Sequence, residues 1–173
     1  MTSLDQPVRI IAATAADVPD ILRCIRALAD YERLTSACVA TEALLHETLF
    51  GETPAAEVLL ARQGDATAGF ALWFRSYSTF LARPGIYLED LFVFPAWRGH
   101  GVGTRLLAEL ARIAVARNYG RLEWAVLDWN ADAIRFYRSL GAVPMDEWTT
   151  FRVDGAALAA LGQRASGRRG REP

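Results

Sequence analysis

Lysine is absent from this sequence, and all 19 basic residues among its 173 are arginines. Without a lysine amine the chain cannot form a Schiff base or supply the lysine of a P-loop. Cysteine is nearly absent: Cys24 and Cys38 lack the C-x-x-C spacing, so neither a disulfide framework nor a zinc site is predicted. The two histidines, His46 and His100, do not have the spacing of metal ligands, and no metal is expected.

Long apolar runs are also missing, and the first residues do not combine a basic stretch with an apolar one. The sequence therefore predicts a cytoplasmic protein that does not enter the membrane. Residues 164–173 hold four arginines and one glutamate, which leaves the rest of the chain net acidic. An acidic body favours a small cationic partner over nucleic acid. Length and composition predict one domain over residues 1–162, followed by a basic, disordered tail over 163–173.

Hydrophobic periodicity predicts a mixed order of elements in the first half and alternating strands and helices in the second. Thr14 and Asp17 are spaced for a capping box at the first helix. Strands are expected over 8–14, 56–62, 67–77, 85–94, 121–127 and 148–153, and helices over 14–34, 42–51, 103–120 and 130–141. This order indicates an α/β domain built on a mixed sheet.

Three glycines stand in "VFPAWRGHGVGTRLL", between a predicted strand and the longest predicted helix. Helix starts expose unpaired N–H groups and a partial positive charge, and glycines let that backbone approach a phosphate group. Arg98 adds a full charge. The dinucleotide pattern G-x-G-x-x-G is absent and the P-loop needs lysine, which leaves R-x-x-G-x-G at Arg98, Gly101 and Gly103. A tight turn that is simply rich in glycine is the alternative.

The R-x-x-G-x-G segment resembles the phosphate-binding motif of the Gcn5-related N-acetyltransferases (GNAT). The segments "YLEDLFVFPAWRGHGVG", "AVLDWNADAIRFYRSLGA" and "ATAADVPDILRCIRALADYE" are similar to the diamine acetyltransferase branch, which includes spermidine/spermine and thialysine N-acetyltransferases. The resemblance runs from Arg9 to Leu161. It implies a mixed, mostly antiparallel sheet, splayed between its fourth and fifth strands and flanked by helices. It also implies acetyl-CoA as co-substrate, no metal, and a homodimer.

Glu89 is the candidate general base, because an amine must lose its proton before it attacks a thioester. Strict alternation along the strand predicts that Glu89 and its neighbour Asp90 face opposite ways. Apolar surroundings would raise the proton affinity of the Glu89 carboxylate. The alternative from the residues alone is a strand bulge, or pairing of these carboxylates with arginines. The resemblance implies that this glutamate contacts the amine and deprotonates it.

Tyr137 is the candidate general acid for the departing thiolate, because a phenol stays protonated at neutral pH. The segment "AIRFYRSLG" is also an amphipathic helix in which Tyr137 and Phe136 are ordinary packing residues. The resemblance favours the catalytic role. Asn130 is placed to cap the same helix and, by resemblance, to bind the pantetheine arm, and these two roles are compatible.

The resemblance implies two sets of binding residues. Leu91, Phe92 and Val93 are expected to act through their backbone, and His100 as a solvent-facing turn residue within reach of phosphate. The expected coenzyme contacts are Leu91, Phe92, Val93, Arg98, Gly99, His100, Gly101, Val102, Gly103, Thr104, Asn130, Asp132 and Ala133. The expected acceptor contacts are Tyr31, Glu32, Glu89, Asp90, Glu123 and Trp148.

Ser78 and Phe80 stand where polyamine-preferring members of the branch carry an aspartate and a tryptophan. Loss of that carboxylate removes a partner for a second ammonium and favours the thialysine-type members. The sequence therefore predicts direct transfer of acetyl from acetyl-CoA, in a ternary complex, to the primary amine of a small cationic acceptor. The alternatives are an acetyltransferase for a protein or peptide amine or an aminoglycoside-type antibiotic, and a non-catalytic acyl-CoA-binding module.

Overall fold

The structure is a computed structural model that describes residues 7–166. The chain divides after Ala131 into two compact units, and each is described by itself. Within the described residues, no helix is long and apolar enough to cross a membrane.

The first unit is built on a sheet with the strand order β1-β2-β3-β4-β5. Its strands are β1 (Arg9–Ala12), β2 (Glu57–Gln63), β3 (Ala66–Ser78), β4 (Arg83–Val93) and β5 (Leu122–Trp124). The first three pairings are antiparallel and the β4–β5 pairing is parallel, which confirms the predicted mixed, mostly antiparallel sheet. Strands β2 and β3 form a hairpin that turns at Gly64, whose positive φ of 58° suits glycine. Strand β5 is shorter than the predicted range of 121–127.

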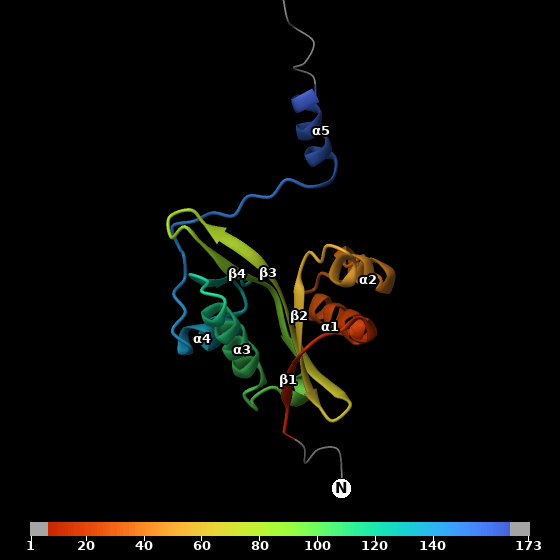
Figure 1. Ribbon diagram of the computed structural model, residues 1–173, viewed down its shortest axis with the longest axis vertical. Coiled ribbons are helices and arrows are strands. Elements are labelled where there is room, and N and C mark those ends of the chain that lie inside the picture. The colour runs from red at the N-terminus through yellow and green to blue at the C-terminus, as the bar shows by residue number, and fades with distance from the viewer. Residues whose placement is uncertain (1–6, 167–173) are drawn as a thin grey trace, which may run out of the picture. The chain divides into compact units, whose positions relative to one another are not determined.

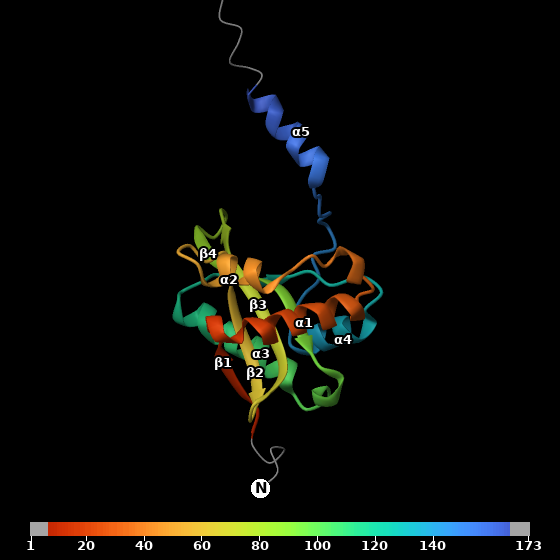
Figure 2. The ribbon, with the colours of Figure 1, turned by 90° about the vertical axis from the view of Figure 1, so that its right-hand side faces the viewer.

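Helices cover both faces of this sheet (Figure 1). In the first unit they are α1 (Val18–Tyr31), α2 (Glu42–Phe50) and α3 (Val102–Ala116). Helices α1 and α2 pack on one face and α3 on the other, and Figure 2 shows α1 lying across the strands. Helix α3 ends before the predicted Gly120, because Asn118 takes a left-handed φ of 55° just beyond it.

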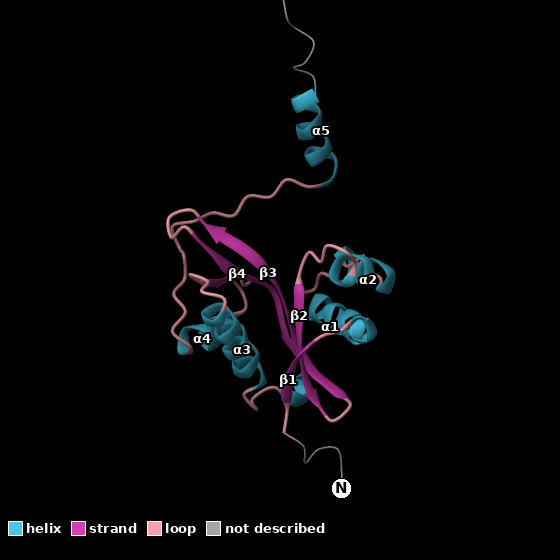
Figure 3. Cartoon of the chain, in the orientation of Figure 1, coloured by secondary structure: helices cyan, strands magenta, loops and turns pink. Residues whose placement is uncertain are grey.

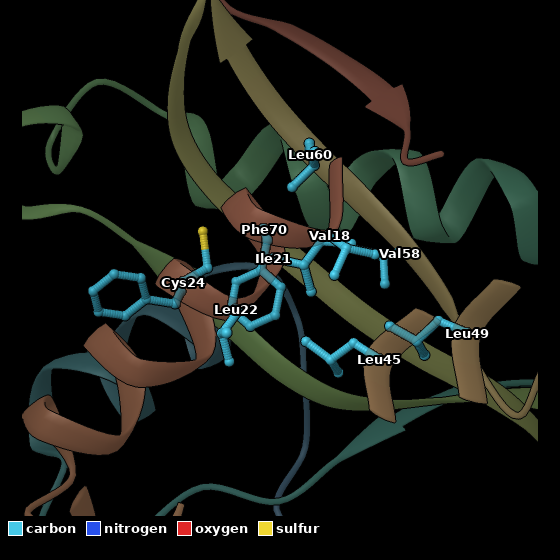
Figure 4. Close-up of a cluster of buried hydrophobic side chains, with 10 residues drawn as sticks. Val18, Ile21, Leu22, Cys24, Leu45, Leu49, Val58, Leu60 and Phe70 are labelled. Atoms are coloured by element: carbon cyan, nitrogen blue, oxygen red, sulfur yellow. The ribbon is translucent and has the colours of Figure 1, made fainter. Parts of the chain in front are cut away.

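The main core cluster lies between the sheet and helices α1 and α2 (Figure 4). The apolar residues at helical spacing in α1 point into this cluster. The strands contribute side chains from one face of the sheet only. Its members are Val18, Ile21, Leu22, Cys24, Leu45, Leu49, Val58, Leu60, Phe70 and Phe92. The apolar pattern of residues 42–51 would also place Leu44 on the buried face with Leu45 and Leu49, but Leu44 is exposed. The 100° turn per residue carries its side chain off the buried stripe.

The first helical segment begins as predicted. Thr14 and Asp17 form the capping box at a short 3₁₀ turn that leads into α1. The guanidinium of Arg62 on β2 then joins Asp17, Asp20 and Thr67 in one hydrogen-bonded network. This network ties the start of α1 to the β2–β3 hairpin. Helix α2 starts at residue 42, as predicted, and Thr41 caps it: Thr41 Oγ1 accepts from the Leu44 N–H at 3.3 Å.

The second unit contains most of α4 (Ala131–Ser139) and all of α5 (Gly155–Ser166). The strand predicted over 148–153 does not form, and Figure 3 shows the segment between the two helices as loop. A strand needs a partner for its hydrogen bonds, and the side chain of Phe151 is 89% exposed in this segment. Helix α5 extends over the first residues of the predicted tail, while 167–173 lie outside the described residues.

Candidate active site

A β-bulge in β4 places Glu89 at the centre of the site. Leu88 pairs with Trp73 and Asp90 pairs with Leu72, so Glu89 is the extra residue between two cross-strand pairs. The bulge was one of the alternatives left open for this acidic pair, and it is compatible with a chemical role because bulges re-aim side chains. The prediction that the side chains of Glu89 and Asp90 face opposite ways assumed strict alternation along the strand. The bulge interrupts that alternation here.

Strands β4 and β5 separate immediately after this bulge. Their pairing covers Ile86 with Leu122 to Leu88 with Trp124, whereas β4 continues to Val93. This confirms the predicted splay between the fourth and fifth strands. Phe94 donates its N–H to Ala68 of β3, so by alternation the N–H groups of Leu91 and Val93 face the side that β5 has left.

Arg98 occupies part of that open side. Its Nε donates to the carbonyl oxygen of Val93 at 2.9 Å. Its guanidinium lies 4.8 Å from the ring centroid of Tyr31 and 5.5 Å from that of Phe92. These contacts hold Arg98 against β4 and the end of α1, and its contact with the coenzyme stays a prediction.

The glycine-rich turn leads directly into α3. Gly99 and Gly101 have φ values of 76° and 73°, in the left-handed region that favours glycine. Arg105 donates its N–H to Gly101, and this is the first bond of the helix, so the N–H groups of residues 102–104 lie ahead of the helical ladder. His100 is an exposed turn residue, as expected. The geometry is that of an anion-binding helix start.

The buried carboxyl environment predicted for Glu89 belongs to Asp90. Glu89 is exposed, whereas burial and the nearby charges of Glu89 and Glu32 raise the pKa of Asp90 to about 6. Glu32, at the end of α1, also has a raised pKa because of burial. The fold thus gathers Glu32, Glu89 and Asp90, three predicted acceptor-binding residues, beside the point where β4 and β5 part.

Tyr31 links three segments that are distant in sequence. Its hydroxyl donates to Asn130 Oδ1 at 3.3 Å, and its ring lies 5.9 Å from that of Trp129. Arg98 covers the same tyrosine. The end of α1, the β4 edge and the loop before α4 are therefore held together, and two predicted site residues, Tyr31 and Asn130, are in contact.

Glu123 lies on β5 opposite Tyr87, on the part of the sheet where β4 and β5 are still paired. It forms an ion pair with Arg121, whose Nε lies 2.6 Å from Glu123 Oε2. Arg121 was not among the predicted site residues, although it stands directly before β5 and two positions before Glu123. Two-residue spacing puts both side chains on one face of the sheet.

The remaining predicted site residues belong to the second unit. Asp132 forms an ion pair with Arg135 on the exposed side of α4. Tyr137 is half-buried, with its ring centroid 5.3 Å from that of Phe136. Ala133 is half-buried on the same helix, and Trp148 is exposed in the following loop. Each was predicted from the resemblance, and each stays a prediction.

Sequence reasoning missed Phe74, Tyr87 and Trp129. The rings of Phe74 and Tyr87 are neighbours across β3 and β4, with centroids 5.2 Å apart. This pairing depends on the register of the hairpin, which no local pattern fixes. Trp129 stands next to Asn130 in the quoted segment "AVLDWN", so proximity to a predicted ligand was the available clue.

Among the described residues, no three His, Cys, Asp or Glu side chains are grouped so as to hold a metal ion. The available chemistry is that of carboxylates beside an open strand edge, with a helix start able to bind an anion. Such a site suits transfer between a bound anionic carrier and a cationic molecule.

Comparisons with known proteins agree with this geometry. The Acetyltransferase (GNAT) family matches residues 25–142. A thialysine N-epsilon-acetyltransferase of Bos taurus is 40% identical over 165 residues, covering 89% of this chain and 96% of the relative. An L-ornithine N5-acetyltransferase of Arabidopsis thaliana is 36% identical over 198 residues, covering 88% and 87%.

The fold is shared with solved structures. An integron cassette protein from the mobile metagenome of V. cholerae superposes with a TM-score of 0.77 at 29% identity, covering 90% of this chain and 98% of the other. An aminoglycoside acetyltransferase from a soil metagenome shares the fold alone, with a TM-score of 0.73 at 17% identity and coverage of 85% and 95%. Together with the family match over most of the chain, these findings confirm the predicted resemblance, and the chain belongs to the GNAT family of acetyltransferases.

Proposed function

We propose that this enzyme transfers the acetyl group of acetyl-CoA to the side-chain amine of a small cationic acceptor of the thialysine or ornithine kind. The observation that carries the proposal is the open edge of β4, which begins at an acidic bulge and ends at the glycine-rich start of α3. Relatives that are 36–40% identical over nearly their full length act, by their names, on thialysine and L-ornithine. Ser78 in place of an acidic residue supports the same choice over polyamines.

The coenzyme is proposed to bind through backbone groups. The N–H groups of Val102, Gly103 and Thr104 precede the first bond of α3, and they would receive the diphosphate. The amides of the pantetheine arm would pair with Leu91 and Val93, as an added strand does at a free sheet edge. This arrangement would bring the thioester to the place where β4 leaves β5, next to Glu89.

The acceptor amine would lose a proton to Glu89, directly or through a water molecule. An alkylamine has a pKa of about 10.4, so only roughly one molecule in 2,500 is neutral at pH 7 without such a base. The neutral nitrogen attacks the thioester carbonyl, and the tetrahedral intermediate then collapses with loss of the coenzyme thiolate. Glu32 and Asp90 would attract the cationic acceptor.

Tyr137 is proposed to protonate the departing thiolate, and Asn130, Asp132 and Ala133 to contact the coenzyme arm. A phenol with a pKa of about 10 is protonated at neutral pH and can donate to a thiolate whose acid has a pKa of about 8.5. Support for these four roles comes from the resemblance. Asn130 also lies against Tyr31 in the first unit, beside the open edge.

The test is release of free thiol from acetyl-CoA with a panel of thialysine, ornithine, lysine, diamines, spermidine, an aminoglycoside and a lysine peptide. We expect turnover with the amino acids that carry a side-chain amine. Tyr137→Phe should lower kcat by about 10²-fold, because it removes the proton donor, and should leave the Kd for coenzyme A unchanged. Tyr77→Phe, an exposed tyrosine on β3, is the matched control.

A folded protein that binds no coenzyme A in calorimetry would contradict the whole proposal. Turnover with only the peptide or the aminoglycoside would support an acetyltransferase but contradict the proposed acceptor. Equal rates for Tyr137→Phe and the unmodified protein would remove Tyr137 from the reaction.

We also propose that the chain forms a homodimer. Val143, Met145, Trp148 and Phe151 are apolar and strongly exposed within nine residues of the second unit, and exposed apolar side chains close together in a chain support a contact with a partner. Light scattering should give twice the chain mass of 19.1 kDa. A single-chain mass at micromolar concentration would contradict the dimer.

A further inference from the structure

One face of the sheet carries a row of side chains that the reaction described above does not use. Leu72 of β3 packs against the core beneath α1 and α2, so Phe74, two residues further on, lies on the same face. Tyr87 pairs with Phe74, and Glu123 of β5 pairs with Tyr87. The row therefore runs Phe74, Tyr87, Glu123 across three neighbouring strands.

Arg121 stands just before β5, one step ahead of the Ile86–Leu122 pair, and forms an ion pair with Glu123 at the outer end of this row. Its Nε lies 2.6 Å from Glu123 Oε2, and both side chains are more than one-third exposed. Gly85 lies alongside on β4, where a Cβ atom would come within 3.1 Å of Arg121 Cγ. Glycine at this position lets the arginine side chain lie close to the sheet and beside the aromatic pair.

The next pair along the same face is Leu72 with Asp90, adjacent to the bulged Glu89. One face of β3 and β4 therefore presents the carboxylates first, then the rings of Phe74 and Tyr87, and Glu123 with Arg121 beyond them. Consecutive positions on one face of a strand are roughly 7 Å apart. An extended chain advances roughly 1.2 Å per bond, so the distance from the terminal nitrogen to Cα is roughly 5 Å in ornithine and roughly 6 Å in thialysine, slightly less than this interval.

The charges at the outer end select one kind of molecule. A second ammonium, as in a diamine, would meet the Glu123 carboxylate only beside the positive charge of Arg121. The α-ammonium and α-carboxylate of an amino acid match both partners at once, and a planar guanidinium binds a carboxylate through two donors. The rings of Phe74 and Tyr87 offer an apolar surface to the carbon or thioether chain between the two ends.

We propose that Arg121 and Glu123 bind the α-carboxylate and α-ammonium of the acceptor, and so make the enzyme an acetyltransferase of amino acids in preference to diamines. Phe74 and Tyr87 support the chain that joins this head group to the reacting amine. The inference rests on the proposed function, which it deepens by naming the residues that recognise the non-reacting end of the acceptor.

The test compares ornithine with 1,4-diaminobutane, which differs from it only by the α-carboxylate. The unmodified enzyme should show a kcat/KM at least about 10-fold higher for ornithine. Arg121→Gln should lower kcat/KM for ornithine by about 10- to 100-fold, the usual range for losing a charge-assisted hydrogen bond. It should raise the value for the diamine by up to about 3-fold, because it removes the charge that opposes the second ammonium. Arg75→Gln, at an exposed arginine on the opposite face of β3, is the matched control and should leave both values unchanged.

Glu123→Gln provides a second variant, and it should lower kcat/KM for both acceptors because both carry the non-reacting ammonium. An unchanged ornithine-to-diamine ratio in Arg121→Gln, or a diamine preference in the unmodified enzyme, would overturn the inference and leave the acetyltransferase intact. Absence of turnover with every acceptor would instead contradict the proposed function, and this inference with it.

Discussion

Glu89→Gln is expected to lower kcat by about 10²- to 10⁴-fold, the usual contribution of a general base. The substitution keeps the size and hydrogen-bonding capacity of the side chain but removes its ability to take a proton from the amine. Glu89 is exposed at the bulge, so the fold should tolerate the change. Initial rates of thiol release at saturating acetyl-CoA measure the effect, and Glu52→Gln, an exposed carboxylate in the loop after α2, is the control.

The pH dependence should identify Glu89 as the group that takes the proton. Amines are more often neutral at high pH, so the rate of Glu89→Gln should recover steadily as the pH rises toward 10. A variant whose rate stays within 3-fold of the unmodified enzyme at pH 7 would show that another group, such as Asp90, accepts the proton.

Asp90→Asn should differ from Glu89→Gln, because its effect should appear in the free energy of unfolding and in KM and not mainly in kcat. Burial and two neighbouring carboxylates raise the pKa of Asp90 from its ordinary value of 3.8 to about 6, so its ionised form is disfavoured in the folded protein. Removing that charge should therefore raise the free energy of unfolding by about 1–2 kcal/mol above pH 7. The gain should shrink as the pH falls through 6 and vanish below about 4, where the natural carboxyl is protonated in both states.

Phe70→Ala is expected to lower the free energy of unfolding by about 3–5 kcal/mol. The side chain of Phe70 is 0% exposed and stands in the core cluster between the sheet and helices α1 and α2 (Figure 4). The loss combines the transfer of a phenyl group to water with the cavity that it leaves. A loss of this size is a large fraction of the 5–15 kcal/mol that usually stabilises a domain.

Urea unfolding followed by circular dichroism measures this loss. Phe80→Ala is the matched control, because Phe80 is 95% exposed and its removal should change the free energy of unfolding by less than about 0.5 kcal/mol. Similar losses for the two variants would contradict the core described here.

Local patterns in the sequence predicted most elements of this fold. The helices α1, α2, α3 and α4 carry apolar residues at helical spacing or clear start signals, such as the capping box at Thr14. The wrong predictions concern segments whose structure depends on pairing with another strand. Strand β5 is shorter than its apolar run because β4 pairs with it only up to Leu88, and residues 148–153 form no strand within the part of the chain described.

The candidate site likewise has parts that local sequence patterns predict and parts that depend on distant residues. The glycine-rich turn was predicted from spacing alone, since a positive φ at Gly99 and Gly101 is a local property. The contact of Tyr31 with Trp129 joins positions about a hundred residues apart and leaves no local pattern. The sequence predicted the apolar surroundings for Glu89, but Asp90 is the carboxyl group with the more buried position. The difference follows from one bulge, which alternation along a strand cannot reveal.

That bulge also reverses the phase of β4. Ahead of it, the N–H of Ile86 faces β5, and Leu88 lies beside Trp73, which Arg117 at the end of α3 covers. Beyond it, Phe92 joins the opposite core, under α1 and α2. An uninterrupted strand would keep Leu88 and Phe92 on one side and turn the amides of Leu91 and Val93 inward to β3. A single inserted residue thus lets one strand serve two cores and frees an edge for a second molecule, so deleting residue 89 would disrupt packing and recognition together.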